Sequence, residues 1–275
     1  MSPRCAVLGD PIDHSLSPVL HRAAYDALGL DWTYDAVRVA SGQLPGYVDG
    51  LGPEWRGLSL TMPLKREVVP LLTSMDRWTE ISGAANTLLL DSDGGRHGLN
   101  TDVPGAEAAL GQAGDATLRR ALVLGGGATA ASVLLALAER GLEQATVAVR
   151  DVTRAGEVIA ALARHPRAPG VAVVRVDELA ASEAAADVVV STVPASAQSA
   201  TLLEVVCDIP VVFDVVYDPW PTPLMAAART RGHTVVDGLD LLLWQAVDQV
   251  RAMTGRFDVP VDTMREALSR ARRAP

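Results

Sequence analysis

The basic residues of this chain are nearly all of one type, and this singles out its one lysine. Of 24 lysine and arginine residues, 23 are arginine and only Lys65 is lysine. Asparagine is almost as rare, with Asn86 and Asn100 alone. Arginine cannot replace lysine where the side chain must lose its proton or fit a narrow space. These three residues are therefore the first candidates for a functional site.

Further polar side chains occur before and after Lys65 in the first part of the chain. They are Ser15, Ser17, Thr61, Asn86, Asn100, Thr101 and Asp102. Hydroxyls, amides and one ammonium suit a small polyol that bears a carboxylate. The chain has no G-x-S-x-G sequence, and no grouping of His, Asp or Glu has the spacing of metal ligands. We predict a small-molecule site without a metal, and expect His14 and His21 to pack or to cap a helix.

A second candidate site is a glycine-rich turn of the form G-x-G-x-x-A over residues 125–130. It follows the apolar run 121–124, a predicted strand, and precedes a helical pattern over residues 128–141. In that context glycine lets the backbone approach a pyrophosphate, which then lies at the positive end of the helix. The predicted contacts of this dinucleotide site are Gly125, Gly126, Gly127, Ala128 and Thr129.

The tip of the next strand distinguishes NAD from NADP. An acidic residue there binds the ribose 2′-hydroxyl of NAD, whereas arginine binds the 2′-phosphate of NADP. Arg150 comes first after the strand and Arg154 lies one helical turn beyond, so two guanidinium groups can clamp a phosphate. Asp151 between them favours NAD, so we predict NADP and leave NAD open. Thr192 and Val193 end another buried strand and are predicted to touch the nicotinamide ribose or ring.

Strand and helix patterns alternate along the chain. Strands are predicted over residues 5–8, 32–39, 57–62, 87–90, 98–99, 121–124, 145–149, 171–176, 187–192, 211–215 and 234–236. Helices or helical turns are predicted over residues 17–28, 43–50, 64–72, 103–113, 128–141, 153–164, 223–231, 239–253 and 261–273. Ser17 as the cap and Pro18 in the first turn mark the start of the first helix.

This alternation predicts an α/β protein of two domains. Strands separated by helices imply a parallel sheet that is covered on both faces. We expect an N-terminal α/β substrate domain of residues 1–102 plus 239–275. Residues 103–238 are expected to form a C-terminal Rossmann-type domain with a doubly wound parallel sheet.

Composition excludes several classes of protein. Apolar residues make up 49% of the chain and charged residues 21%, which excludes a disordered chain. The net charge is −9, and the arginines of residues 270–273 are an expected exposed helix end, so we expect no nucleic-acid partner. Three glycines interrupt the longest uncharged stretch, 121–137, so we expect no membrane span. The N-terminal apolar run is too short for a signal peptide.

The two cysteines indicate whether the protein resides in a reducing or an oxidising compartment. Cys5 and Cys207 are far apart in the sequence, each in an apolar run. They predict buried thiols in a reducing compartment rather than a disulfide scaffold. We therefore expect a cytoplasmic protein, monomer or homodimer, whose partner is a small-molecule substrate.

Several segments together resemble the shikimate dehydrogenase family. They occur in the family's order and are residues 9–18 (GDPIDHSLSP) with His21, 59–65 (SLTMPLK), 83–87 (GAANT), 100–102 (NTD), 217–224 (YDPWPTPL) and 237–245 (DGLDLLLWQ). The resemblance covers most of the chain. It implies a shikimate-binding N-terminal domain and a Rossmann domain for NADP, with the active site in the cleft between them.

The resemblance also implies roles for individual residues. Ser15 and Ser17 would hydrogen-bond the substrate carboxylate, with Tyr217 nearby. The residues that would hold the substrate hydroxyls are Thr61, Asn86, Asp102 and Gln245. Lys65 would be the acid/base, paired with Asp102.

The reaction implied by the resemblance is the reversible, NADP-dependent reduction of 3-dehydroshikimate to shikimate, a step towards the aromatic amino acids. Hydride delivered to a ketone carbon leaves negative charge on the oxygen, and a nearby ammonium can donate a proton as that charge grows. Asp102 would keep Lys65 charged and oriented. Arginine at position 65 would scarcely give up its proton.

Some positions depart from the family's pattern. Ser59 stands where many members have asparagine, Leu64 is apolar before the lysine, and Val149 replaces a common asparagine. Asp240 replaces a frequent glycine just after Gly238, which is expected to contact the cofactor. A quinate/shikimate or aminoshikimate-type dehydrogenase that tolerates NAD, and a non-catalytic ligand-binding homologue, therefore stay open as alternatives.

Overall fold

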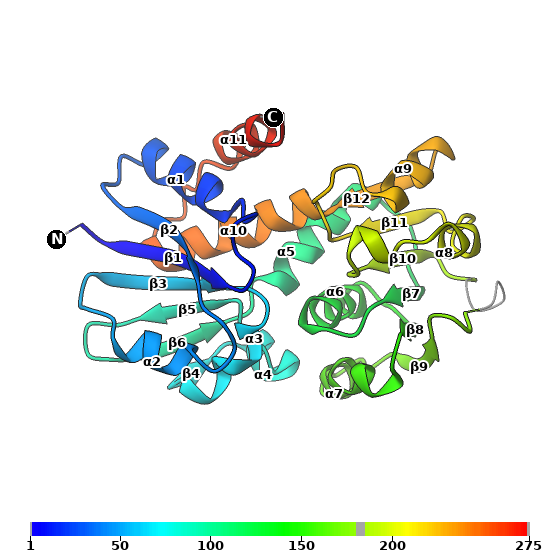
Figure 1. Ribbon diagram of the computed structural model, residues 1–275, viewed down its shortest axis with the longest axis horizontal. Helices are drawn as coiled ribbons and strands as arrows, with labels where there is room; N and C mark the ends of the chain where they lie inside the picture. Colours follow the sequence, from blue (N-terminus) through cyan, green and yellow to red (C-terminus); the bar gives the residue numbers. More distant parts are fainter. Residues whose placement is uncertain (1, 180–184, 274–275) are drawn as a thin grey trace. The chain divides into compact units, whose positions relative to one another are not determined.

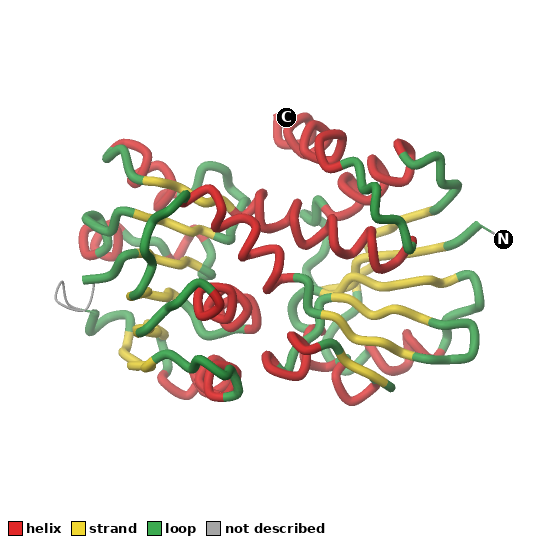
Figure 2. The backbone as a smooth tube through the Cα atoms, turned by 180° about the vertical axis from the view of Figure 1, so that it is seen from behind, coloured by secondary structure: helices red, strands yellow, loops and turns green. Residues whose placement is uncertain are grey.

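The computed structural model describes residues 2–179 and 185–273 of the chain. The chain divides into two compact units. The first unit comprises residues 1–101 and 242–275, and the second comprises residues 102–241. Each unit contains one six-stranded sheet with helices packed on it (Figures 1 and 2).

The sheet of the first unit is mixed. Its strands, in spatial order, are β2 (Thr33–Arg38), β1 (Arg4–Gly9), β3 (Trp55–Leu60), β5 (Thr87–Leu90), β6 (Arg96–Leu99) and β4 (Ser74–Met75). Strand β1 pairs in parallel with β2 and β3, whereas β5 runs antiparallel to β3 and β6. The carboxyl ends of β1 and β3 therefore meet at one edge of the sheet.

Helices cover both faces of this sheet. They are α1 (Ser17–Ala27), α2 (Leu44–Asp49), α3 (Leu64–Glu67), α4 (Arg77–Ser82), α10 (Gly238–Thr254) and α11 (Val261–Arg273). Successive residues of a strand face opposite sides. Accordingly, Cys5 and Val7 belong to the core under α1 and α10, whereas Ala6 and Leu8 belong to the core under α2 and α3.

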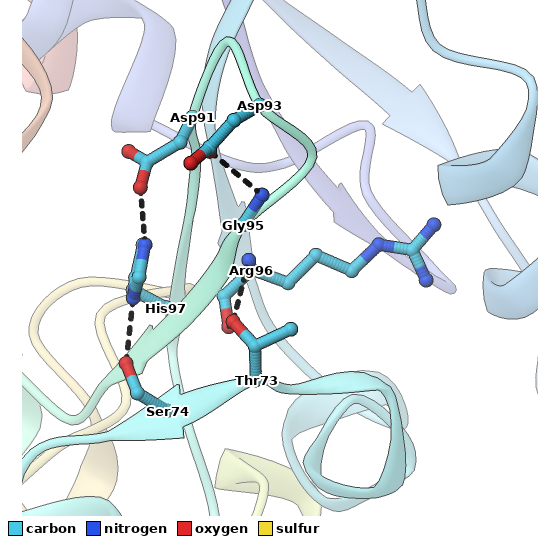
Figure 3. A network of polar contacts seen from close by, with 7 residues as sticks. All are labelled: Thr73, Ser74, Asp91, Asp93, Gly95, Arg96 and His97. Atoms are coloured by element: carbon cyan, nitrogen blue, oxygen red, sulfur yellow. Dashed lines mark hydrogen bonds and ion pairs between the residues drawn. The ribbon is translucent and has the colours of Figure 1, made fainter.

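Polar side chains fasten the short edge strand β4 to its neighbour β6 (Figure 3). Ser74 Oγ lies 2.6 Å from His97 Nδ1, and His97 Nε2 lies 2.5 Å from Asp91 Oδ2. The contact lies close against the backbone of Gly95, where a Cβ would lie 2.8 Å from His97 Nε2 and 2.9 Å from Asp91 Oδ2 and would displace these side chains. The side chains thus supplement the pairing of a strand of only two residues.

The second unit contains a fully parallel sheet. Its strands, in spatial order, are β12 (Thr234–Asp237), β11 (Val211–Asp214), β10 (Val188–Ser191), β7 (Arg120–Leu124), β8 (Gln144–Val149) and β9 (Gly170–Arg175). The chain runs outward from β7 through β8 to β9, and then outward on the other side through β10, β11 and β12. This is the doubly wound order, and β7 is where the order reverses.

Helix α5 (Asp102–Ala109) precedes the first strand of this sheet. The helices that connect its parallel strands are α6 (Ala128–Glu139), α7 (Gly156–Ala163), α8 (Ala200–Val205) and α9 (Pro223–Thr230). Residues of α8 and α9 share one core with the sheet, and α6 and α7 lie on its other face (Figure 1). The predicted fold class, a two-domain α/β protein with a Rossmann-type sheet, is confirmed.

Some local predictions differ from the structure. The predicted helical stretch 64–72 is α3 followed by a separate turn of 3₁₀ helix over Val69–Leu71. Helices α4 and α8 and strand β4 were not predicted, and Cys207 is half-buried rather than buried. Among the described residues, no helix combines the length and apolar character that a membrane crossing requires.

Candidate active site

Lys65 lies just beyond the carboxyl end of β3, as the second residue of α3. The turn before it is closed by a hydrogen bond from Leu64 N to Thr61 O at 2.8 Å. Ala85 N donates to Lys65 O at 2.7 Å, which ties the backbone of the lysine to the residue before Asn86. The first unit thus brings three predicted site residues, Thr61, Lys65 and Asn86, into one region.

Asn86 is the centre of a buried hydrogen-bonded cluster. Its Oδ1 accepts from Thr101 N and from Thr87 Oγ1, each at 2.9 Å. Its Nδ2 donates to Thr101 Oγ1 at 2.9 Å and to Gln245 Oε1 at 3.2 Å. The side chains of Asn86 and Gln245, 159 residues apart in the sequence, are therefore neighbours. Asp102, the next residue after Thr101, is 5% exposed and begins α5.

Asn100, the other asparagine, stabilises the loop that leads to this cluster. Asn100 is 1% exposed, and its Nδ2 donates to Ser82 Oγ at 2.9 Å and to Ala84 O at 3.0 Å. These bonds hold the loop that leads from α4 to Asn86. A charged or shorter side chain would leave the buried Ala84 carbonyl without this donor.

The start of α1 differs from the prediction. Leu16 is the N-cap and Ser17 is already helical, and no side chain caps this end within the described chain. The prediction that Ser17 caps the helix is wrong. Instead, Ser17 is 5% exposed and its side chain is hydrogen-bonded to Tyr34, while Ser15 Oγ accepts from Ser17 N at 3.3 Å. Both predicted serines therefore lie together at this helix start.

His21 packs below these serines, as expected, and is neutral. Its Nδ1 lies 2.9 Å from Ser17 O and so carries the proton, and its ring stacks on Tyr34 with centroids 3.9 Å apart. Complete burial lowers the pKa of His21 from 6.5 to about 4, opposed in part by the bond to Ser17 O. The charged imidazolium is thus excluded from this core.

We expect acid to destabilise the protein through His21. Between pH 6.5 and 4 the unfolded chain binds more protons at this residue than the folded one. The free energy of unfolding therefore falls as the pH falls, by about 2 kcal/mol at pH 5. Denaturation at pH 7.5 and pH 5 should show this loss in the wild type and in His14→Gln, which changes an exposed histidine. His21→Phe should lack it, and equal losses in all three proteins would contradict the assignment.

In the second unit, the glycine turn lies at the carboxyl ends of β7, β8 and β10. Gly125 has φ +112°, and a Cβ there would lie 2.3 Å from Thr192 Oγ1 and 3.5 Å from Val193 Cγ1. Thr192 Oγ1 donates to Leu124 O at 3.0 Å. A Cβ on Gly126 would lie 2.4 Å from Arg154 O. Two glycines, Thr192, Val193 and the backbone of Arg154 thus meet at the point where the strand order reverses.

Helix α6 begins at this turn with Ala128 and Thr129. Its N-cap is Gly127, and within the described chain no side chain caps its first turn. The backbone N–H groups at the start of a helix carry partial positive charge and bind phosphate oxygens. The turn therefore has the chemistry of a pyrophosphate site.

The acidic residue between the two arginines has a structural partner. Asp151 Oδ1 accepts from Thr153 N at 3.0 Å and from Thr153 Oγ1 at 2.8 Å, and so caps a 3₁₀ turn over Val152–Ala155. These hydrogen bonds, chiefly, lower the pKa of Asp151. Arg150 precedes this turn and Arg154 lies within it, and both arginines are exposed. The turn leaves both arginine side chains on the surface beside the glycines.

Tyr217 lies in the loop after β11, and this loop is held at both ends. Asp214, fully buried at the end of β11, accepts from Thr222 Oγ1 at 2.6 Å, and burial raises the pKa of its carboxyl group. At the start of α10, a Cβ on Gly238 would lie 2.2 Å from Val215 O. The two predicted residues Tyr217 and Gly238 therefore belong to segments that pack closely. Among the described residues, no three His, Cys, Asp or Glu side chains form a group that could hold a metal ion.

Comparison with known proteins identifies the family. Residues 7–88 match the shikimate dehydrogenase substrate binding domain, residues 107–205 match shikimate/quinate 5-dehydrogenase, and residues 238–268 match the shikimate 5′-dehydrogenase C-terminal domain. Shikimate dehydrogenase (NADP(+)) from Rubrobacter xylanophilus is 37% identical over 96% of this chain and 94% of its own. The corresponding protein of Methylobacterium radiotolerans is 38% identical over 92% of both chains. The chain belongs to the shikimate dehydrogenase family.

Solved structures of shikimate dehydrogenases share the fold over the whole chain. The enzyme from Mycobacterium tuberculosis aligns with a TM-score of 0.88 at 39% identity, covering 98% of this chain and 99% of its own. A quinate dehydrogenase from Corynebacterium glutamicum in complex with NAD has the same TM-score and coverage at 31% identity.

Sequence reasoning missed several polar residues of this site. Tyr34, Thr87 and Gln249 are buried and hydrogen-bonded to predicted site residues, but none was singled out from the sequence. Only Gln249 had a signal that could have identified it. It lies four residues after Gln245, on the same face of one helix.

Proposed function

We propose that this protein catalyses the NADP-dependent interconversion of 3-dehydroshikimate and shikimate. The observation that carries the proposal is the buried Asn86 cluster beside the chain's single lysine. In it, amides and hydroxyls from distant segments converge in a chain that matches shikimate dehydrogenases over nearly its full length. Both cysteines are free thiols, as a reducing compartment such as the cytoplasm maintains, and we place the reaction there.

The first unit supplies the groups that a polyol carboxylate requires. We assign Ser15 and Ser17, side by side at the start of α1, to the carboxylate. The residues assigned to the ring hydroxyls are Thr61, Asn86, Asp102 and Gln245. We place Tyr217, in the loop after β11, near the carboxylate. Each hydroxyl that a bound ligand leaves without a hydrogen-bond partner in this site would cost about 1–3 kcal/mol of binding free energy. The cluster therefore selects ligands that pair with all of its polar groups.

Lys65 is the proposed acid/base. During reduction its ammonium donates a proton to the substrate oxygen as negative charge develops there, and during oxidation its amine takes the proton back. Asp102 is the proposed partner that keeps the ammonium charged and oriented. The nicotinamide cofactor, when bound, supplies or accepts the hydride.

The second unit fits a dinucleotide that carries a 2′-phosphate. Gly126 packs against Arg154 O, whereas a Cβ on Gly127 would meet nothing within 4 Å, so the start of α6 at Gly127 has room for the pyrophosphate. We assign Gly125, Gly127, Ala128 and Thr129 to the same contacts. Thr192, Val193 and Gly238 are assigned to the nicotinamide end. Asp151 is engaged by Thr153 while Arg150 and Arg154 are exposed, which supports the phosphate of NADP over the ribose hydroxyl of NAD.

Arg150→Ser should weaken NADP binding selectively. A charge-assisted hydrogen bond to phosphate contributes about 1.5–3 kcal/mol, so we expect KM for NADP to rise by ~10-fold or more while KM for NAD changes less than twofold. Initial rates with both cofactors at saturating shikimate measure this. Arg175→Ser is the matched control, because it removes an exposed arginine from the neighbouring strand β9. Equal rises in KM for NAD and for NADP would show that Arg150 does not bind the 2′-phosphate.

A quinate dehydrogenase is the second candidate, favoured by the likeness to the Corynebacterium glutamicum protein in complex with NAD. Nicotinamide absorbance should be followed with shikimate and quinate, each crossed with NADP and NAD. We expect fast turnover with shikimate and NADP alone. Comparable turnover with quinate and NAD would establish the second candidate, and no turnover in any pair would indicate an amino-substituted ring or a non-catalytic binding protein.

A further inference from the structure

A continuous line of buried hydrogen bonds runs through the first unit from α1 to the Asn86 cluster. The Tyr34 hydroxyl, hydrogen-bonded by Ser17, donates to Ser59 Oγ at 2.6 Å. Ser59 Oγ donates to Gln249 Oε1 at 2.8 Å. Gln249 Nε2 then donates to Asn86 O at 3.1 Å and to Thr87 Oγ1 at 3.0 Å. The line therefore connects Ser17, which we assign to the substrate carboxylate, with Asn86, which we assign to a ring hydroxyl.

The backbone oxygen of Asn86 fixes the direction of the bonds between Gln249, Ser59 and Tyr34. Asn86 O can only accept, so Gln249 must turn its Nε2 towards it and its Oε1 towards Ser59. Ser59 must then donate its single proton to Gln249, and so it accepts from Tyr34. Burial raises the pKa of Tyr34, which keeps this hydroxyl protonated as a donor.

The same logic fixes the amides that face the ligand. Thr101 N donates to Asn86 Oδ1 and so fixes that atom as an acceptor, and Thr87 Oγ1, which accepts from Gln249, therefore donates its own proton to it. Asn86 Nδ2 consequently faces Gln245 Oε1, and Gln245 Nε2 donates to Leu242 O at 2.8 Å. With its oxygen and one N–H engaged, Gln245 offers its remaining N–H to a ligand.

We infer that Ser59 and Gln249 are positioning residues, which orient the Asn86 and Gln245 amides so that Gln245 donates to a substrate hydroxyl. This inference rests on the proposed function. The Ser59 hydroxyl and both ends of the Gln249 amide are hydrogen-bonded within this line, so we assign neither residue to the substrate. This positioning role also accounts for Ser59, where many family members carry asparagine. The Ser59 hydroxyl accepts from Tyr34 and donates to Gln249.

Kinetics of Ser59→Ala, Gln249→Leu and the double variant test this role. Removal of the Ser59 hydroxyl leaves Gln249 Oε1 buried without its donor, which weakens the hold of this amide on Asn86 O and Thr87 Oγ1. We expect KM for shikimate to rise about tenfold in each single variant and no further in the double variant, because both changes break one line. KM for NADP and kcat should stay within twofold, and Ser59→Thr, which keeps the hydroxyl, should restore KM.

The control variant is Thr79→Val, which removes a buried hydroxyl of the same unit that has no hydrogen-bond partner in the described structure. It should leave KM unchanged. A merely structural role for Ser59 would lower Tm and leave KM for shikimate at the wild-type value. That result, with a wild type that turns over shikimate, would overturn the inference and leave the proposed function standing.

A second readout requires no activity. Because the chain has only two asparagines, selective ¹⁵N labelling of asparagine gives side-chain amide signals from Asn86 and Asn100 alone. In Ser59→Ala and Gln249→Leu the Asn86 signals should shift clearly while those of Asn100, held by Ser82 and Ala84, stay in place. Unmoved Asn86 signals would overturn the inference even in a protein that fails to turn over shikimate.

Discussion

Lys65→Met should lower kcat by about 10³-fold, which corresponds to about 4 kcal/mol of transition-state stabilisation. Methionine keeps the length of the side chain but cannot supply a proton to the developing alkoxide. Substrate binding should change less, because we assign the hydroxyls and the carboxylate to other side chains. Steady-state rates in both directions, with shikimate and with 3-dehydroshikimate, measure the loss.

Lys65→Arg separates charge from proton transfer. It keeps a positive charge at the site, but the guanidinium does not give up its proton near neutral pH. We expect kcat to stay at least 100-fold below wild type in this variant too. Arg56→Met removes one positive charge on strand β3, as Lys65→Met does in α3, and should retain wild-type turnover. Full activity in Lys65→Arg would mean that the residue acts only through its charge.

The parts of the site that the sequence predicted are those where one residue type is required by local chemistry. The turn between a buried strand and a helix consists of glycines because glycine alone leaves room for Thr192 and the Arg154 carbonyl. This requirement for glycine is visible in the sequence. The scarcity of lysine and asparagine likewise pointed to Lys65, Asn86 and Asn100. For Asn100 the structure gives a supporting role in holding the loop before Asn86.

Contacts between distant segments were not predictable in this way. The Asn86–Gln245 bond joins residues 159 positions apart, and the line from Tyr34 to Gln249 depends on packing between β2, β3 and α10. Nothing in the local sequence indicates which buried hydroxyl will meet which amide. Ser17 illustrates the same limit, because serine before proline predicts a cap, yet the structure uses its hydroxyl on Tyr34.

The role of Asp151 also became interpretable only in the structure. From the sequence, an acidic residue between two arginines favours NAD. Its hydrogen bonds from Thr153 show that the carboxylate orders the turn that carries Arg154. A side chain that stabilises its own loop is less available to a ribose hydroxyl, and this shifts the balance towards NADP.

Gly126→Ala should weaken NADPH binding by ~100-fold without unfolding the protein. A Cβ at this position would lie 2.4 Å from Arg154 O, where ordinary contacts begin at 3.4 Å, so one of the two segments must move by about 1 Å. Overpacking of this kind costs about 1–3 kcal/mol. The displaced segments carry the proposed pyrophosphate and 2′-phosphate contacts, so the loss falls on cofactor affinity, where 100-fold is about 2.7 kcal/mol.

Fluorescence titration with NADPH measures the dissociation constant, and thermal unfolding confirms that each variant is folded. Gly156→Ala is the matched control, because a Cβ there meets nothing within 4 Å although it lies two residues from Arg154. Gly127→Ala adds a Cβ that likewise meets no protein atom, so any loss of affinity in that variant reports the approach of the cofactor itself. Wild-type affinity in Gly126→Ala would show that the turn absorbs the extra methyl group, and that its close packing against Arg154 does not hold the cofactor site in shape.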